Sequence, residues 1–165
     1  MRSVKKPKMT AKQHALYLIN RREYGKDELI ENLVRKGHEE KDVIDAVNHL
    51  SEIDIQSDKR ALQTTISLGI SRKDGPHKVM AKLRQKKLNA EENKNSAEDI
   101  LEQIDFEGQA KELVERKYGK GPFDRDKKRK ITNHLLGKGY TLQQALKATE
   151  QNDDDNFDDN STEEY

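Results

Sequence analysis

Residues 33–38 read LVRKGH, residues 83–88 read LRQKKL and residues 135–140 read LLGKGY. The three stretches share a leucine at the first position and a lysine at the fourth, and they start 50 and then 52 residues apart. Two of them place a glycine directly after that lysine. Glycine often ends a helix because it adopts a left-handed conformation without strain. A chain that contains the same helix end three times is predicted to consist of repeats.

The composition limits the core that such repeats can form. The chain has 165 residues, of which 32% are hydrophobic, 5% are aromatic and 38% are charged. So little apolar material favours small helical units stacked in a row over an enzyme built around one large pocket. The absence of cysteine excludes disulfides and cysteine-ligated metals and fits a reducing cytosol. With no run of roughly 18 apolar residues and no signal peptide, we expect a cytoplasmic protein.

Apolar residues recur at helical spacing along most of the chain, as in Leu29, Ile30 and Leu33, and no convincing strand alternation occurs. The pattern therefore predicts an all-α fold. Turn signals such as Gly75-Pro76 and the Thr141/Gln144 capping pair divide the helices into groups of three.

Helix ends can be placed from the same signals. The expected helices cover residues 11–22, 25–37 and 40–50, then start near Asp58, Gly75 and Asn89, then cover 106–118 and start after Asp124 and Thr141. The helix after Asn89 is expected to be broken or lengthened at 93–96. The architecture expected is a set of tandem three-helix repeats that form a short, curved, elongated array.

The expected domain organisation follows from these groups. It comprises a basic N-terminal extension (1–10), three-helix repeats at 11–54, 55–104 and 105–149, and an acidic disordered tail (150–165). The tail holds eight acidic residues and no lysine or arginine, so it cannot bury enough apolar surface to fold. The body, residues 1–149, then carries 32 basic and 31 − 8 = 23 acidic residues, a net charge of +9. A basic body indicates a polyanionic partner or an acidic protein surface.

The basic residues gather on two of the expected helices. Residues 76–90 contain five lysines and arginines and no acid, and Lys78, Lys82 and Lys86 are spaced to share one helical face. Like charges at this spacing cost about 0.2–0.5 kcal/mol per pair. Residues 124–138 contain six basic and two acidic residues. The two helices could form one continuous basic stripe, or a solvated face that acids from neighbouring helices balance.

On the first interpretation, ten residues are predicted to contact a phosphate backbone or acidic protein loops. They are Arg72, Lys73, Lys78, Lys82, Arg84, Lys86, Lys87, Arg125, Lys128 and Arg129. Most aromatic residues, Tyr17 among them, fall at helix ends or on packing faces, and outside the tail only Phe123 is expected to be free to stack on a base. Any contact with DNA should therefore be electrostatic rather than base-specific.

Several stretches together resemble the RecX family of bacterial regulatory proteins over about residues 11–149. The matching residues of the first repeat are Arg21, Arg22, Tyr24, Glu28, Leu29, Leu33, Lys36 and Gly37. Those of the second are Asp58, Arg60, Gly75, Pro76 and Leu83, and those of the third are Lys117-Tyr118-Gly119 and Gly137-Lys138-Gly139-Tyr140. The chain departs from the family pattern at Ala61, at Lys87 and at Asn93-Lys94-Asn95.

The resemblance implies a function. Members of the family bind the RecA–DNA filament, lie in its helical groove, and inhibit its ATP hydrolysis and strand exchange without being enzymes. The partner it implies is the RecA filament. We also expect contact with the backbone phosphates of single- or double-stranded DNA, and we expect the protein to be a monomer. The alternative is a sequence-independent DNA-binding helical protein that acts by occupying DNA.

Other function classes lack a supporting residue set. No phosphate-binding GxxxxGK[ST] loop and no nucleophile motif such as GxSxG occurs. The five histidines form no HExxH and no evident ligand cluster. An enzyme is therefore not expected, nor is any metal or other cofactor.

Overall fold

The structure is a computed structural model that describes residues 8–88 and 91–150, the side chains of 91–95 excepted. Helices account for the regular structure of these residues, and no strand occurs among them. Their bounds are α1 (Ala11–Ile19), α2 (Lys26–Arg35), α3 (Glu40–Glu52), α4 (Asp58–Ser71), α5 (Pro76–Gln85), α6 (Glu91–Glu102), α7 (Phe106–Tyr118), α8 (Arg125–Gly137) and α9 (Leu142–Lys147). The all-α fold predicted from apolar spacing is confirmed. None of the described helices is long and apolar enough to cross a membrane.

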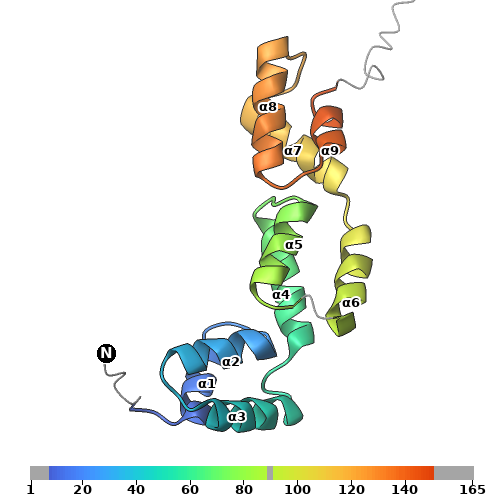
Figure 1. The fold of residues 1–165 in the computed structure, drawn as a ribbon. Helices are drawn as coiled ribbons and strands as arrows, with labels where there is room; N and C mark the ends of the chain where they lie inside the picture. The colour runs from blue at the N-terminus through green and yellow to red at the C-terminus, as the bar shows by residue number, and fades with distance from the viewer. Residues whose placement is uncertain (1–7, 89–90, 151–165) are drawn as a thin grey trace, which may run out of the picture.

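Each set of three consecutive helices encloses its own hydrophobic cluster. Figure 1 shows the three sets one after another along the molecule. We call the three sets the first bundle (α1–α3), the second bundle (α4–α6) and the third bundle (α7–α9). Leu29 and Leu33 of α2, Val79 and Leu83 of α5, and Ile131 and Leu135 of α8 are fully buried in the respective clusters. The clusters support the three repeats as we divided them, while the exact boundaries remain a prediction.

The helix end that occurs three times in the sequence has one geometry in all three bundles. The residue after the shared lysine is left-handed, with φ of 92° at Gly37, 57° at Lys87 and 90° at Gly139. The next N–H then donates to the carbonyl of the shared leucine, as Tyr140 does to Leu135 at 3.1 Å. This is the Schellman arrangement, and it satisfies carbonyl groups that a helix end would leave free. The structure thus has three equivalent helix ends, although Lys87 is not a glycine.

Most predicted helix starts are also confirmed. Asp124 accepts from the N–H of Lys127 at the start of α8, and Thr141 forms a capping box with Gln144 at the start of α9. Pro76 opens α5. The predicted cap at Asn89 lies outside the described residues.

One predicted helix end is wrong, and one open alternative is resolved. The helix α6 runs without a break from Glu91 to Glu102, so of the two alternatives expected at 93–96, a broken or a lengthened helix, the structure shows the continuous one. The helix α1 ends at Ile19 rather than near Arg22. The chain turns there and buries the ring of Tyr24, with the Arg22 guanidinium 3.5 Å from the ring centroid.

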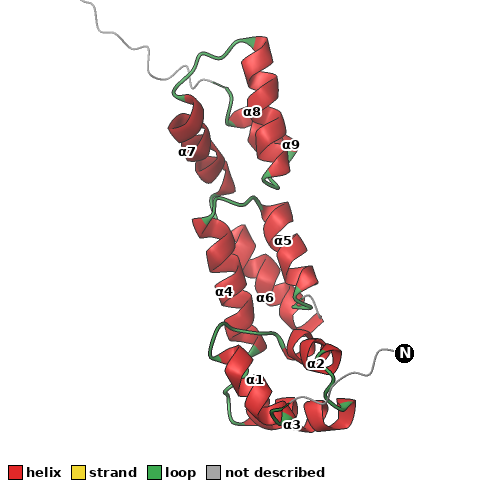
Figure 2. Ribbon diagram, turned by 90° about the vertical axis from the view of Figure 1, so that its left-hand side faces the viewer, coloured by secondary structure: helices red, strands yellow, loops and turns green. Residues whose placement is uncertain are grey.

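The second helices of the three bundles follow one another end to end, as Figures 1 and 2 show for α8, α5 and α2. At the start of α5, the N–H of Gly75 donates to Lys138 (2.8 Å) and that of His77 donates to Gly139 (3.0 Å). At the start of α2, a Cβ on Gly25 would lie only 3.1 Å from the carbonyl oxygen of Lys86. The C-terminal end of one second helix therefore meets the N-terminal end of the next, so opposite ends of neighbouring helix dipoles face each other, although α2 runs across the direction of α5 (Figure 1).

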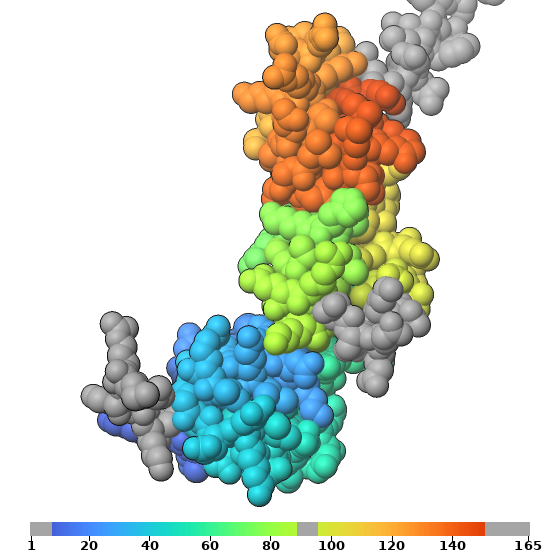
Figure 3. Space-filling model, in the orientation of Figure 1, coloured from blue at the N-terminus to red at the C-terminus, as the bar shows by residue number. Residues whose placement is uncertain are grey.

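This stacking gives an elongated and bent molecule. In Figures 1 and 3 the third bundle lies directly above the second, while the first bundle is set to one side at the lower end. The short, curved, elongated array predicted from the sequence is confirmed. The turn between α7 and α8 forms the end of the molecule that lies farthest from the first bundle (Figure 2).

Candidate nucleic-acid interface

Asp74 organises the lysines at the junction of the second and third bundles. Its side chain is only 2% exposed and lies in the turn between α4 and α5. Lys78 binds it at 3.0 Å, Lys82 binds it more closely, and the Lys138 ammonium from α8 lies 3.9 Å away. Two of the predicted contact residues, Lys78 and Lys82, are therefore paired with a buried carboxylate of their own bundle.

The charge state of Asp74 follows from these contacts. Burial opposes ionisation of its carboxyl group, but the ammonium groups of Lys82 and Lys78 outweigh burial and hold the pKa of Asp74 below its usual value. The carboxylate is thus charged at neutral pH and cancels part of the positive charge on α5. Its backbone carbonyl also accepts from Gln109 of α7 at 3.3 Å.

Other predicted residues on the second bundle differ in their surroundings. Lys73 binds Glu112 of the third bundle, and Lys87 binds Glu31 of the first bundle. Burial and the neighbouring Arg22 lower the pKa of Lys86. The remaining two, Arg72 and Arg84, are exposed and form no salt bridge with a described residue. Neighbouring acids thus balance part of the α5 stripe, as the alternative interpretation anticipated.

The third bundle differs because the cations at its outer end form no salt bridge with a described residue. We define the distal basic tip as the lysines and arginines between the last turn of α7 and the second turn of α8. Its members are Arg116, Lys117, Lys120, Arg125, Lys127, Lys128, Arg129 and Lys130. All eight are exposed, and none forms a salt bridge with any residue that the structure describes. The tip includes Arg125, Lys128 and Arg129, the three contact residues predicted on this helix.

Local structure explains why the tip is exposed. The hydrophobic residues that anchor α8 are Ile131 and Leu135, which lie in its second half, and every residue from 124 to 130 is exposed. The first two turns of α8 therefore project beyond the core of the third bundle. Lys127 is held at the base of the tip, where its ammonium lies 4.9 Å from the centroid of the Phe123 ring and 3.3 Å from the carbonyl oxygen of Tyr118.

The tip is an electrostatic cost to its own helix. Cations at a helix N-terminus face the positive end of the helix dipole, and each such placement costs about 0.3–1 kcal/mol. Arg125 and Arg129 are also like charges four residues apart. Asp124 and Asp126 offset only part of this charge. An anion that approaches the tip from outside the helix would offset the rest of this cost.

One aromatic prediction needs correction. Phe123, expected to be free, packs against the hydrophobic cluster of the third bundle and is covered by Lys127. Tyr17, expected at a helix end or on a packing face, lies in the last turn of α1, where it is 49% exposed and accepts a hydrogen bond from Arg21 at 2.8 Å. The distal basic tip therefore presents charge without a free ring, which suits phosphate contact better than base stacking.

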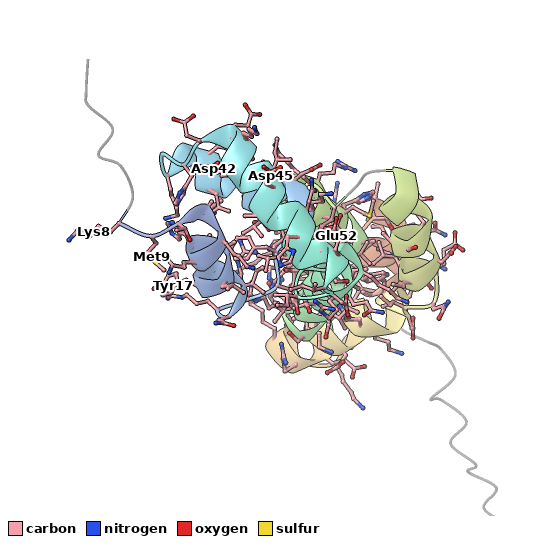
Figure 4. The ribbon with its side chains drawn as sticks, turned by 90° about the horizontal axis from the view of Figure 1, so that it is seen from below. Lys8, Met9, Tyr17, Asp42, Asp45 and Glu52 are labelled. Atoms are coloured by element: carbon pink, nitrogen blue, oxygen red, sulfur yellow. The ribbon has the colours of Figure 1, made fainter. Side chains whose placement is uncertain are left out.

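The opposite end of the molecule is acidic. Figure 4 shows Asp42, Asp45 and Glu52 along α3, which runs across the lower end of the first bundle. Among the residues that the structure describes, charge is thus distributed unevenly along the molecule, which favours the approach of a polyanion to the distal basic tip rather than to α3. Within the described residues no group of three or more metal-ligating side chains is close enough to hold a metal ion.

Five members of the tip were missed by the sequence prediction, which placed contacts on only one face of this helix. They are Arg116, Lys117, Lys120, Lys127 and Lys130. The signal was present, because residues 116–130 read RKYGKGPFDRDKKRK. Arg116, Lys117 and Lys120 were missed because the run crosses a loop, and periodicity within one helix cannot show that two helix ends meet at one tip. Lys127 and Lys130 were missed because they lie on other faces of α8 than Arg125, Lys128 and Arg129.

Comparison with known proteins gives several relatives of similar length, although no family model matches the chain. The chain is 31% identical to the "Regulatory protein RecX" of Acinetobacter baylyi over 135 residues, which cover 81% of this chain and 82% of that protein. It is 32% identical to the protein of the same name from Stenotrophomonas maltophilia (strain R551-3), over 88% and 89% of the two chains. The relative from Halorhodospira halophila is 29% identical over 86% and 87%. On this similarity along most of its length, the chain belongs to the RecX family of regulatory proteins.

Proposed function

We propose that this protein regulates the RecA recombinase by binding the RecA–DNA filament and inhibiting its ATP hydrolysis and strand exchange. Membership of the RecX family supports a regulatory role in the context of RecA. The observation that carries the contact to DNA is the distal basic tip, whose eight exposed cations form no salt bridge with a described residue. In this proposal the tip binds backbone phosphates of the filament's DNA, and the second bundle contributes chiefly through Arg72, at the end of α4, and Arg84 of α5.

The second candidate is a protein that binds DNA directly and acts by occupying it. The same tip favours this candidate, because electrostatic contact with phosphates does not require RecA. The two candidates differ in what limits inhibition. A filament regulator should act at concentrations too low to coat the DNA, whereas an occupying protein should lose its effect when free DNA competes for it.

The experiment that separates them is a RecA ATPase assay on single-stranded DNA, titrated with this protein. We expect inhibition at substoichiometric protein, and we expect it to persist when double-stranded competitor DNA is added. Inhibition that disappears with competitor DNA would support the occupying protein instead. No inhibition at any ratio would contradict both candidates.

The tip itself is tested by neutralising two of its cations. In Lys128→Gln/Arg129→Gln we expect weaker inhibition, and we expect the slope of log affinity for DNA against log salt to fall by about two. The matched control is Lys12→Gln/Lys41→Gln, which removes two exposed cations of the first bundle. Equal effects of the two variants would show that only net charge matters and that the tip is not the contact.

A further inference from the structure

We propose that the acidic segment 151–165 of this same chain docks on the distal basic tip and competes there with nucleic acid. The inference concerns regulation of the surface used in the proposed function, but the docking itself does not depend on RecA. The tip carries unbalanced positive charge, because no carboxylate of the described residues is paired with it.

The segment has the composition that the tip requires. It carries seven acidic residues, no lysine or arginine and therefore only one sign of side-chain charge. The acids are Asp153, Asp154, Asp155, Asp158, Asp159, Glu163 and Glu164. The tip has eight cations, so one copy of the segment comes close to neutralising one copy of the tip. No other run of the chain combines so many acids with no base.

The segment also starts close enough to reach the tip. It follows Glu150, directly after α9, and α9 packs against α8 in the third bundle. The helix α8 is about 20 Å long at 1.5 Å per residue, and the axes of packed helices lie about 8–10 Å apart, so any point on α8 is within about 30 Å of α9. A chain of this length extends to roughly 50 Å. The contact therefore closes within one molecule and needs no movement of the bundles.

Attachment makes even weak docking effective. A short tether gives an effective concentration on the order of 1 mM, so an intrinsic dissociation constant of about 0.3 mM lowers the apparent affinity for DNA about fourfold. Contacts between exposed charges weaken as salt shortens the Debye length. Since a nucleic acid presents a far denser array of negative charge than the segment does, it displaces the segment, whereas weakly anionic surfaces do not. The segment would thus restrict the tip to dense polyanions.

Docking can be observed directly, because the chain has no cysteine and a single one can carry a spin label. We expect a label at Ser161→Cys in the full chain to broaden the backbone amide signals of residues 125–130 at low salt and to lose this effect at high salt. The control is the same label at Glu52→Cys, at the far end of the molecule. Unbroadened signals would overturn the proposal. So would broadening that appears only between labelled and unlabelled molecules, since docking would then be between copies.

Competition is tested in a second full-length variant, in which the seven acids are replaced by Asn or Gln. We expect it to bind a labelled single-stranded oligonucleotide about fourfold more tightly than the unaltered protein at about 50 mM salt, with the two affinities converging at high salt. An unchanged affinity at low salt would contradict competition. These measurements contain no RecA, so a failure of the ATPase prediction and a failure of this one are distinguishable.

Discussion

The left-handed residue that ends each second helix shows how one side chain affects the stability of a helix end. Gly37 and Gly139 adopt this conformation freely, but Lys87 adopts it with φ of 57°. A residue with a Cβ pays about 1–2 kcal/mol for the left-handed conformation. The leucine that anchors each helix end is fully buried, as Leu83 is in the second bundle. The buried anchor therefore holds Lys87 in a conformation that its own backbone disfavours.

We predict that Lys87→Gly raises the free energy of unfolding by about 0.5–1 kcal/mol. The substitution relieves the left-handed strain and loses only the exposed ion pair with Glu31, which is worth little. Urea denaturation followed by circular dichroism would measure the change. The control is Lys86→Gly, where φ is −88° and glycine should destabilise. A Lys87→Gly protein no more stable than the original would show that this helix end is not strained.

Asp74 gives a second prediction at this scale, for stability as a function of pH. Because the pKa of Asp74 is lowered in the folded state, its contribution to stability is present above about pH 4 and is lost as the pH falls through the folded-state value. We expect Asp74→Asn to lower the free energy of unfolding by about 1–3 kcal/mol at pH 7.

The same variant supplies its own internal check. The difference between Asp74→Asn and the original protein should shrink as the pH falls from 7 to 3, because protonated aspartic acid resembles asparagine in charge. Denaturation at each pH would measure it. A difference that stays constant would mean that packing, rather than the ion pairs with Lys78 and Lys82, accounts for the loss.

Only part of the group formed by Asp74 and its three lysines can be predicted from the order of residues. Lys78 and Lys82 follow Asp74 at helical spacing, so two of its partners could be read from the order of residues. The third, Lys138, reaches Asp74 from another bundle, and only the stacking of α8 on α5 brings it there. Local spacing predicts contacts within a helix, whereas contacts across a junction depend on tertiary packing.

At the scale of elements, α8 shows a conflict between stability and binding. Its N-terminal cations oppose the helix dipole, so a change that helps the helix should weaken the tip. We predict that Arg125→Glu raises the free energy of unfolding by about 0.5–1 kcal/mol, because it places an acid in the first turn and four residues before Arg129. The same variant should bind single-stranded DNA more weakly.

These two effects have opposite signs, which makes the prediction specific. Chemical denaturation and oligonucleotide binding by fluorescence anisotropy would be measured on one preparation. Weaker binding together with lower stability would indicate a folding defect instead. Higher stability with unchanged affinity would remove Arg125 from the interface.

Helix starts were the elements best predicted from sequence, because caps are local. Asp124 and the Thr141 capping box acted as expected. At α6 the sequence left a broken and a lengthened helix open at the polar stretch, and the helix continues. Residues without apolar periodicity give no signal of either outcome, since an exposed helical turn needs no buried face. The end of α1 was also mispredicted, because burial of Tyr24 turns the chain away from the helix.

At the scale of the whole molecule, the stacking of bundles depends on a close backbone approach between the second and third. Gly75 begins α5 with φ of −74°, which any residue adopts, so its backbone conformation does not require glycine. Its surroundings do, because a Cβ there would overlap the backbone of Gly139 and Tyr140. The hydroxyl of Tyr140 is fixed at the same junction, where it donates to the Lys73 carbonyl at 3.1 Å and accepts from Gln109 at 2.8 Å.

We therefore predict that Gly75→Ala destabilises the protein by about 1–3 kcal/mol, since backbone atoms cannot move aside as the end of a side chain can. It should also loosen the stacking of the third bundle on the second. In the proposed function both bundles contact the filament, so the variant should also regulate RecA more weakly. Small-angle X-ray scattering would report the change in shape, denaturation the loss of stability and the RecA ATPase assay the loss of function.

The matched control is Gly137→Ala, at the end of α8 and two residues before Gly139. A Cβ at Gly137 would meet no atom within 4 Å, so this variant should keep its shape and gain up to about 1 kcal/mol from the higher helix propensity of alanine. If Gly75→Ala behaved like Gly137→Ala in all three measurements, the junction would not be a close-packed one. If Gly75→Ala changed the shape of the protein and yet inhibited RecA normally, the bundles would act independently. The end-to-end contacts of α8, α5 and α2 would then serve stability rather than regulation.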